Sequence, residues 1–406
     1  MTEPALTEEL VNRLREQADS LGLLRLGVAR LDDPRLRPAR EALTRFVADG
    51  RAGEMTFLER TLDLRCHPEQ LLPDARSAIV VAVPYRGDPG PIARYAQWHD
   101  YHTVMHHRLA SLARWLTARR PGLDALVCVD TKPVPERALA EIAGLGRIGK
   151  NGCVLVPGLG SYVLLGVLLT TAALEQAAPS LPRVGPSGPT LPSPSERSFA
   201  VCGSCTACLD ACPTQAFPAP GELDPRRCIS YLTIESRAAV PEALASLVGP
   251  RIAGCDVCQE VCPHNHSPER EARVPVAAWL PPPPPRDRRP DLLRLLHVGN
   301  NQHRGFVRHT PLNRIPRRTL RRNAAVALAH VQLDNRNIDA ALEQVAADQH
   351  ADEALRAAAR FSLRHRQAQR DAVPPAVPAG QDGIDRRAHA GVEMLVSANA
   401  VEPRDD

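Results

Sequence analysis

The chain has 406 residues and a formal net charge of +4, with 44% hydrophobic and 24% charged residues. That composition is ordinary for a globular protein, and no apolar run approaches the roughly 18 residues that a membrane span requires. The length predicts two or three domains. Of the 50 basic residues only Lys132 and Lys150 are lysines, so arginine abundance alone says little about partners. Residues 1–10 carry no export signal, so we expect a cytoplasmic protein with reduced thiols.

Residues 1–175 alternate helical and extended patterns, which predicts a mixed α/β layer structure. A strand is expected over 77–84, in which residues 78–83 are continuously apolar, as in a strand buried on both faces. The other expected elements are a helix over 5–20, a long helix from 101 to 116, and strands over 23–29, 125–129 and 162–169.

Asp130 follows the apolar run of residues 125–129. An acid at the end of a buried strand faces a ligand crevice or caps a turn or helix, and the pattern by itself favours the cap. Further on, Gly144, Gly146 and Gly149 match the spacing of a dinucleotide-binding loop. The match is weak, because a helical pattern precedes these glycines where that fingerprint needs a strand.

Eight cysteines between 202 and 262 dominate the middle of the chain. They form the runs Cys202-x2-Cys205-x2-Cys208-x3-Cys212-Pro213 and Cys255-x2-Cys258-x3-Cys262-Pro263, with Cys228 between them. This spacing is typical of two-cluster ferredoxins, in which the cysteine before proline reaches across to the other cluster. It predicts two 4Fe-4S clusters, one held by Cys202, Cys205, Cys208 and Cys262 and the other by Cys212, Cys228, Cys255 and Cys258. Zinc sites and disulfides are the weaker alternatives.

Two proline-rich stretches separate this cysteine module from its neighbours, over 176–199 and at 281–285. Residues 301–322 then contain seven arginines and no acid, which is either a phosphate-binding surface or a solvated basic face. Three amphipathic helices are expected over 320–330, 339–347 and 352–364, like the paired helices of a short α-solenoid. Residues 369–406 are predicted to form a flexible tail.

Several different short motifs follow one another along the chain. They are Arg65 with Leu71-Leu72-Pro73, Arg94-Tyr95-Ala96 with Asp100-Tyr101-His102, Val129-Asp130 with Glu136-Arg137-Ala138-Leu139-Ala140, Gly149-Lys150, Gly160-Ser161-Tyr162, and the stretches 227–235, 254–259 and 322–328. With the cysteine runs, and over roughly residues 5 to 365, they make the chain resemble the epoxyqueuosine reductases. These are cobalamin- and iron-sulfur-dependent enzymes of queuosine tRNA modification.

The resemblance implies an α+β multidomain fold. A mixed α/β cobalamin-binding domain would span 1–175, a ferredoxin-like domain with two clusters 200–275, and HEAT-like helical repeats that bind tRNA 286–368. It implies cob(II)alamin bound without a protein histidine on cobalt, which agrees with the lack of an Asp-x-His-x-x-Gly motif. Arg65, Asp130, Ser230 and Asp256 match cobalamin contacts, and Asp130 matches the proton donor. Such a donor needs a raised pKa, which burial at a strand end could supply.

The implied reaction is the reduction of epoxyqueuosine to queuosine at the wobble position of a tRNA anticodon stem-loop. It consumes two electrons, whereas a cluster passes one at a time, so cobalamin would be refilled through the clusters by a reductant such as flavodoxin or ferredoxin. We expect a monomer that contacts tRNA through Arg317, Arg318, Arg321 and Arg322. Two other functions stay open: a corrinoid and iron-sulfur reductase with a non-tRNA substrate, and a non-catalytic iron-sulfur electron-transfer protein.

Overall fold

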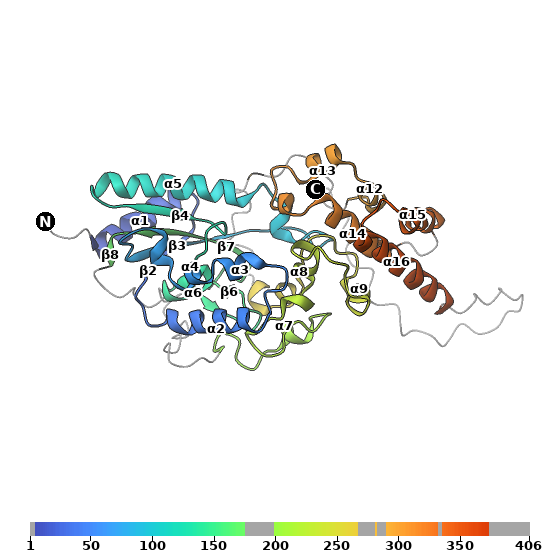
Figure 1. The fold of residues 1–406 in the computed structure, drawn as a ribbon. Helices are drawn as coiled ribbons and strands as arrows, with labels where there is room; N and C mark the ends of the chain where they lie inside the picture. The colour runs from blue at the N-terminus through green and yellow to red at the C-terminus, as the bar shows by residue number, and fades with distance from the viewer. Residues whose placement is uncertain (1–4, 175–198, 267–280, 282–289, 332–334, 373–406) are drawn as a thin grey trace, which may run out of the picture.

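The computed structural model describes residues 5–174, 199–266, 281, 290–331 and 335–372. Its N-terminal part is built on a four-stranded antiparallel sheet of order β2-β3-β7-β4 (Figure 1). The strands are β2 (Arg25–Arg30), β3 (Ser77–Pro84), β7 (Val163–Thr170) and β4 (Ala125–Cys128). All eight residues of β3 are buried, so the predicted central strand is confirmed.

Helices cover both faces of this sheet, which gives three layers (Figure 1). On one face α1 (Glu8–Ser20) and α5 (Tyr101–Arg119) pack against alternate strand residues such as Ile79 and Val81. On the other face α2 (Leu36–Ala48) and α6 (Glu136–Ile142) pack against Ala78 and Val80. Because helices cover both faces of the sheet, both sets of alternating side chains in residues 78–83 of β3 are apolar.

Shorter elements complete this domain. They are β1 (Ala5–Leu6), α3 (Thr56–Arg60), α4 (Leu62–Cys66), η1 (Pro68–Leu71), η2 (Arg94–Gln97), β5 (Arg147–Ile148), β6 (Val154–Leu155) and β8 (Ala173–Leu174). β1 pairs with β8, and β5 with β6. Because α6 precedes Gly144 and the β5–β6 hairpin follows it, this loop lacks the strand-loop-helix order of a dinucleotide site.

The cysteine module folds as short helices between loops. They are α7 (Ala207–Asp210), η3 (Pro225–Arg227), α8 (Ile229–Ile234), α9 (Glu242–Val248), α10 (Val257–Glu260) and η4 (Pro263–Asn265). The module is joined to the first domain through Glu54, whose carboxylate accepts hydrogen bonds from Ser236 Oγ and Arg237 N, both at 2.7 Å. The backbone N–H of Glu54 donates to the hydroxyl of Tyr231 at 2.8 Å.

The C-terminal part is helical. It comprises α12 (Leu292–Leu296), α13 (Asn300–Val307), η5 (Pro311–Arg314), α14 (Arg317–Leu328), α15 (Arg336–Ala347) and α16 (Glu353–Ala372). The three expected helices are present, although α14 begins at Arg317 and α16 continues to Ala372. The predicted tail therefore cannot begin at residue 369, and residues 373–406 lie outside the described part. Residues 176–198 and 282–285 of the two predicted spacers also lie outside it.

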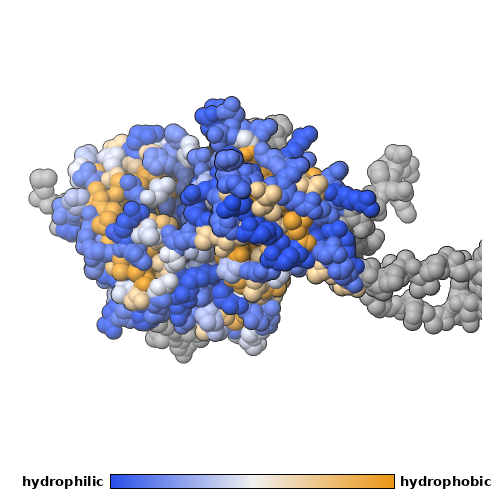
Figure 2. All heavy atoms as spheres, turned by 45° about the vertical axis from the view of Figure 1, so that its right-hand side comes forward, coloured by the Kyte–Doolittle hydropathy of each residue, from blue (hydrophilic) through white to orange (hydrophobic). Residues whose placement is uncertain are grey.

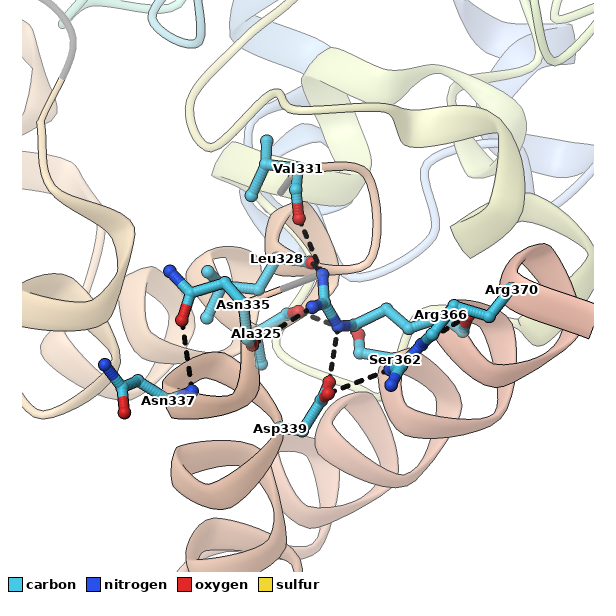
Figure 3. Close-up of polar contacts among 9 residues, drawn as sticks. All are labelled: Ala325, Leu328, Val331, Asn335, Asn337, Asp339, Ser362, Arg366 and Arg370. Carbon is cyan, nitrogen blue, oxygen red and sulfur yellow. Dashed lines mark hydrogen bonds and ion pairs between the residues drawn. The ribbon is translucent and has the colours of Figure 1, made fainter. Parts of the chain in front are cut away.

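Arg366 ties these helices together from within their core (Figure 3). Its side chain is fully buried and its guanidinium donates to Asp339 Oδ1 at 2.7 Å and to the carbonyls of Leu328 and Val331 at 3.0 and 2.6 Å. Leu328 is the last residue of α14, where a carbonyl has no intrahelical partner, and Val331 lies in the segment that follows the helix. The buried guanidinium of Arg366, on α16, therefore binds both these carbonyls and Asp339 of α15, which holds the three helices together.

The described face in Figure 2 is mostly hydrophilic, with apolar residues in scattered patches. Among the described residues the large apolar side chains counted as exposed are Leu247 and Val261. No helix within the described ranges combines the length and apolar character needed to cross a membrane.

Candidate functional site

Four of the eight cysteines line one small cavity. Cys202, Cys205, Cys208 and Cys262 surround it, together with Lys150 and Asn151 of the first domain. This is the first of the two sets that the ferredoxin spacing predicts, including the residue before proline from the second run. The cavity is therefore consistent with a cluster held by these four thiolates.

The second set gathers around α8 and the start of α10. Burial raises the pKa of Cys255 to about 11, and the Cys228 thiolate acts in the same direction. Burial also raises the pKa of Cys228, and there Cys212 acts in the same direction, so these thiols lie within electrostatic range of one another. The backbone N–H of Ala216 points at Cys212 Sγ at 3.3 Å. Such a donor stabilises a cluster thiolate.

The alternatives for the cysteines receive no support. All eleven cysteines of the chain are free, so the disulfide interpretation is wrong for this structure. Across the part of the chain that the structure describes, no three Cys, His, Asp or Glu side chains converge on a point where one metal ion could bind. A mononuclear zinc site needs such a convergence.

Asp130 lies just beyond the end of β4, in a left-handed backbone conformation (φ +50°) that is costly for a residue with a side chain. Its carboxylate accepts hydrogen bonds from Tyr101 Oη at 3.1 Å and His102 Nε2 at 3.4 Å, both on the first turn of α5. Its backbone N–H donates to Glu136 Oε1 at 2.8 Å. These partners of the carboxylate are side chains of α5, so Asp130 does not cap a helix.

His102 connects two acids. Its Nδ1 lies 2.6 Å from Asp100 Oδ1, while its Nε2 faces Asp130. Burial alone would lower the pKa of His102, but the two carboxylates outweigh it and raise that pKa to about 9. The imidazole is therefore protonated at neutral pH.

The electrostatics of Asp130 differ from our expectation. The Asp130 side chain is 47% exposed, and the hydrogen bond from His102 holds the pKa of its carboxyl group below the usual value. Next to Asp130, the carboxyl group with a raised pKa is Glu136, at about 8, because of burial and the adjacent Asp130 carboxylate. Burial also raises the pKa of Asp256, to about 6. The expectation of a raised pKa at Asp130 was wrong. At neutral pH, His102 and Glu136 are therefore protonated and Asp130 is ionised.

The other residues matched to cobalamin come from both the first domain and the cysteine module. Arg65 acts electrostatically on Asp130 and Glu136 from α4. On the cysteine module, Ser230 Oγ accepts the backbone N–H of Cys255 at 3.1 Å, and Asp256 Oδ2 accepts that of Arg94 at 2.8 Å. Burial is the largest cause of the raised pKa of Tyr95, to which both Asp130 and Asp256 contribute.

Tyr101, His102 and Glu136 had no predicted role, although they lie within the short motifs of the sequence. A signal was available, because Glu136 lies at the start of a helix six residues after Asp130 and Tyr101 and His102 follow the helix cap Asp100. What the sequence could not show is that the start of α5 meets the end of β4.

The basic segment contributes less to the surface than its sequence suggests. Arg317 donates to the carbonyl of Val298 at 3.2 Å and Arg321 to that of Leu296 at 2.7 Å. Arg322 is buried, with 1% of its surface exposed, so its predicted contact with tRNA was wrong. Arg318 remains exposed.

Known protein families match the two segments of the chain that carry most of these residues. Residues 201–265 match the family model of the 4Fe-4S double cluster binding domain, and residues 65–131 match the model described as Epoxyqueuosine reductase QueG, DUF1730. The chain is 39% identical over 326 residues to the epoxyqueuosine reductase of Gloeobacter violaceus, covering 78% of this chain and 95% of that protein. It is 33% identical to that of Salmonella typhimurium, covering 84% and 85%.

Solved structures of epoxyqueuosine reductases also match this chain over most of its length. A crystal structure of epoxyqueuosine reductase with a tRNA-Tyr epoxyqueuosine-modified stem loop matches with a TM-score of 0.68 and 29% identity, over 88% of this chain and 90% of that one. The enzyme from Streptococcus thermophilus matches with a TM-score of 0.69 and 25% identity, over 91% and 95%.

The double cluster module, packed against a domain with an acidic loop at the sheet's edge, defines an iron-sulfur oxidoreductase. The extent and identity of the matches show that this chain belongs to the epoxyqueuosine reductase family.

Proposed function

We propose that this protein reduces epoxyqueuosine to queuosine at the wobble position of tRNA. The observation that carries the proposal is the Asp130 loop, where an acid, a protonated imidazole and a protonated carboxyl group meet within hydrogen-bonding range. Opening an epoxide and releasing water consumes two protons, and this group of residues holds two at neutral pH.

The cofactors that fit are two 4Fe-4S clusters and cob(II)alamin. The two cysteine sets would hold the clusters. Arg65, Asp130, Ser230 and Asp256 offer the guanidinium, carboxylate and hydroxyl groups that pair with the amide side chains of a corrin. Bound there, cobalamin would supply the reducing chemistry, with electrons arriving singly through the clusters from a flavodoxin or ferredoxin. A monomer suffices for this arrangement, since all these residues come from one chain.

The chain's own residues would deliver the protons. His102 Nε2 gives its proton to Asp130 Oδ2, and Asp130 passes it to the opening C–O bond. Asp100 keeps His102 oriented through the bond to Nδ1, and Tyr101 fixes the Asp130 carboxylate from the other side. Glu136 holds the second proton next to the backbone of Asp130.

This proton store predicts an alkaline limit to turnover. Both pKa values are raised above the ordinary values of the groups, so the protonated forms persist at neutral pH and are lost as pH rises through about 8 for Glu136 and about 9 for His102. We expect the rate to fall over that range when it is measured with a viologen donor, whose potential does not depend on pH. The Glu136→Gln variant should lack the lower inflection. A rate that stays constant beyond pH 9 would refute the assignment.

We propose that the helical part, as HEAT-like repeats, and the cysteine module together hold the tRNA. Burial lowers the pKa of Arg237, and Arg314 and Arg318 act in the same direction, so these guanidinium groups lie near one another. Arg314 also acts electrostatically on Asp130, which supports an RNA contact by this arginine near the proposed reaction site. Arg318→Ala should weaken tRNA binding and lower the slope of its salt dependence by about one. An unchanged slope in the folded variant would place the RNA elsewhere.

The biological test of the reaction is a deletion strain. Its tRNA should carry epoxyqueuosine in place of queuosine when the nucleosides are analysed by mass spectrometry. Expression of the wild-type protein should restore queuosine. Unaltered queuosine in the deletion strain would contradict the proposed function.

A further inference from the structure

Lys150 places an ammonium group against the first cysteine loop. Its Nζ donates to the carbonyl of Gly203 at 2.8 Å and to that of Cys205 at 2.9 Å. The same side chain lines the cavity that Cys202, Cys205, Cys208 and Cys262 surround. A positive charge from the first domain is thus held at the wall of the first proposed cluster site.

The position of this ammonium is fixed from several sides. The carbonyl of Lys150 accepts the backbone N–H of Gly221 at 2.8 Å, and Gly149 N donates to the carbonyl of Cys153 at 2.9 Å. The neighbouring Asn151 donates through Nδ2 to the carbonyl of Cys258, 3.3 Å away in the second cysteine run. Residues 149–153 therefore contact both cysteine runs, but only the first receives a charged group from them.

The choice of lysine also points to a specific requirement. Only two of the 50 basic residues in this chain are lysines. Two carbonyls of one loop converge on a single Nζ, which suits a compact ammonium with three donors better than the planar fork of a guanidinium.

A 4Fe-4S cluster with four thiolates is an anion that gains a further negative charge on reduction. A fixed cation beside it stabilises the reduced form more than the oxidised form. We propose that Lys150 is a positioning residue that raises the reduction potential of the first cluster while it holds the loop of Cys202 and Cys205 in place. This inference rests on the proposed cluster assignment and not on the identity of the substrate.

Three substitutions separate charge from hydrogen bonding: Lys150→Gln keeps a donor without charge, Lys150→Met removes both, and Lys150→Arg keeps the charge. Iron is first counted in each anaerobic holoprotein, and both clusters are then titrated potentiometrically with detection by electron paramagnetic resonance. In the two neutral variants we expect the ratio of reduced to oxidised first cluster to fall about tenfold at a given potential, or about 59 mV for a one-electron couple. The second cluster is the internal control and should not shift.

A Lys150→Gln protein with full iron content and unchanged potentials would overturn the inference. If the neutral variants lose half of their iron, retention of all iron by Lys150→Arg supports the role of the charge, whereas equal loss from all three variants overturns it. None of these readouts requires tRNA. A protein that shows the shift but does not act on epoxyqueuosine would refute only the proposed function.

Discussion

Replacing Asp130 with asparagine is expected to lower the rate of epoxide reduction by about 10² to 10⁴-fold, the usual effect of losing a positioned general acid. The amide has the shape of the carboxyl group and can keep a hydrogen bond from Tyr101, but it cannot take the proton of His102 and pass it on. Iron content, measured by metal analysis, should stay at the wild-type level because neither cysteine set is touched. Corrinoid content, measured by absorbance, should also be retained, because the amide keeps the shape of the Asp130 side chain and a polar group that can pair with the corrin amides.

The matched control is Asp124→Asn. Asp124 is an exposed acid directly before the other end of β4, and its backbone, not its carboxylate, bonds to Thr171. That variant should turn over normally. Near-normal turnover by Asp130→Asn, with cofactors retained, would exclude Asp130 as the proton donor.

Replacing Arg322 with methionine is expected to destabilise the fold by about 3 to 5 kcal/mol, since it removes the charge from a buried network. The Arg322 guanidinium donates to the carbonyl of Ser236 at 3.0 Å, to those of Leu232 and Ala238, and to Asn323 Oδ1. Asn323 Nδ2 in turn donates to the carbonyls of Thr233 and Ile252 at 2.7 Å. Without the cation, buried carbonyls of the cysteine module lose their partners.

The neighbouring Arg318→Met variant is the control, because Arg318 is on the same helix and exposed. Its stability should change by less than about 0.5 kcal/mol. Thermal melting followed by circular dichroism compares the two proteins. Equal melting temperatures would show that Arg322 contributes no more than a surface residue. The comparison also shows why neutralising all four arginines of α14 would confuse tRNA affinity with stability.

The cysteine module and the central strand were predictable because their signals are local. Spacing alone groups Cys202 with Cys262, and the cavity brings the same four residues together. Similarly, the uninterrupted apolar run over 78–83 leaves few alternatives to a strand buried on both faces. The strand ends moved by one or two residues, within the usual uncertainty of boundaries.

The burial and protonation of charged residues were harder to predict from the sequence, because both depend on partners that are distant in sequence. Arg322 looks like a surface residue in a basic run, yet carbonyls more than 80 positions away make it a core residue. Asp130 was expected to hold a proton, but the fold brings His102 of α5 against it and shifts the proton to the imidazole. Neither contact has a signature in the local pattern.

Reduction of epoxyqueuosine by the purified holoprotein is the most direct test of the proposed function. The protein is reconstituted anaerobically with iron, sulfide and cobalamin, reduced, and incubated with tRNA that carries epoxyqueuosine, and the wobble nucleoside is analysed by mass spectrometry. We predict conversion to a nucleoside that has lost one oxygen atom and co-elutes with queuosine, dependent on cobalamin and on the intact cysteines. Unchanged epoxyqueuosine, with both clusters and cobalamin present and reducible, would contradict the proposal.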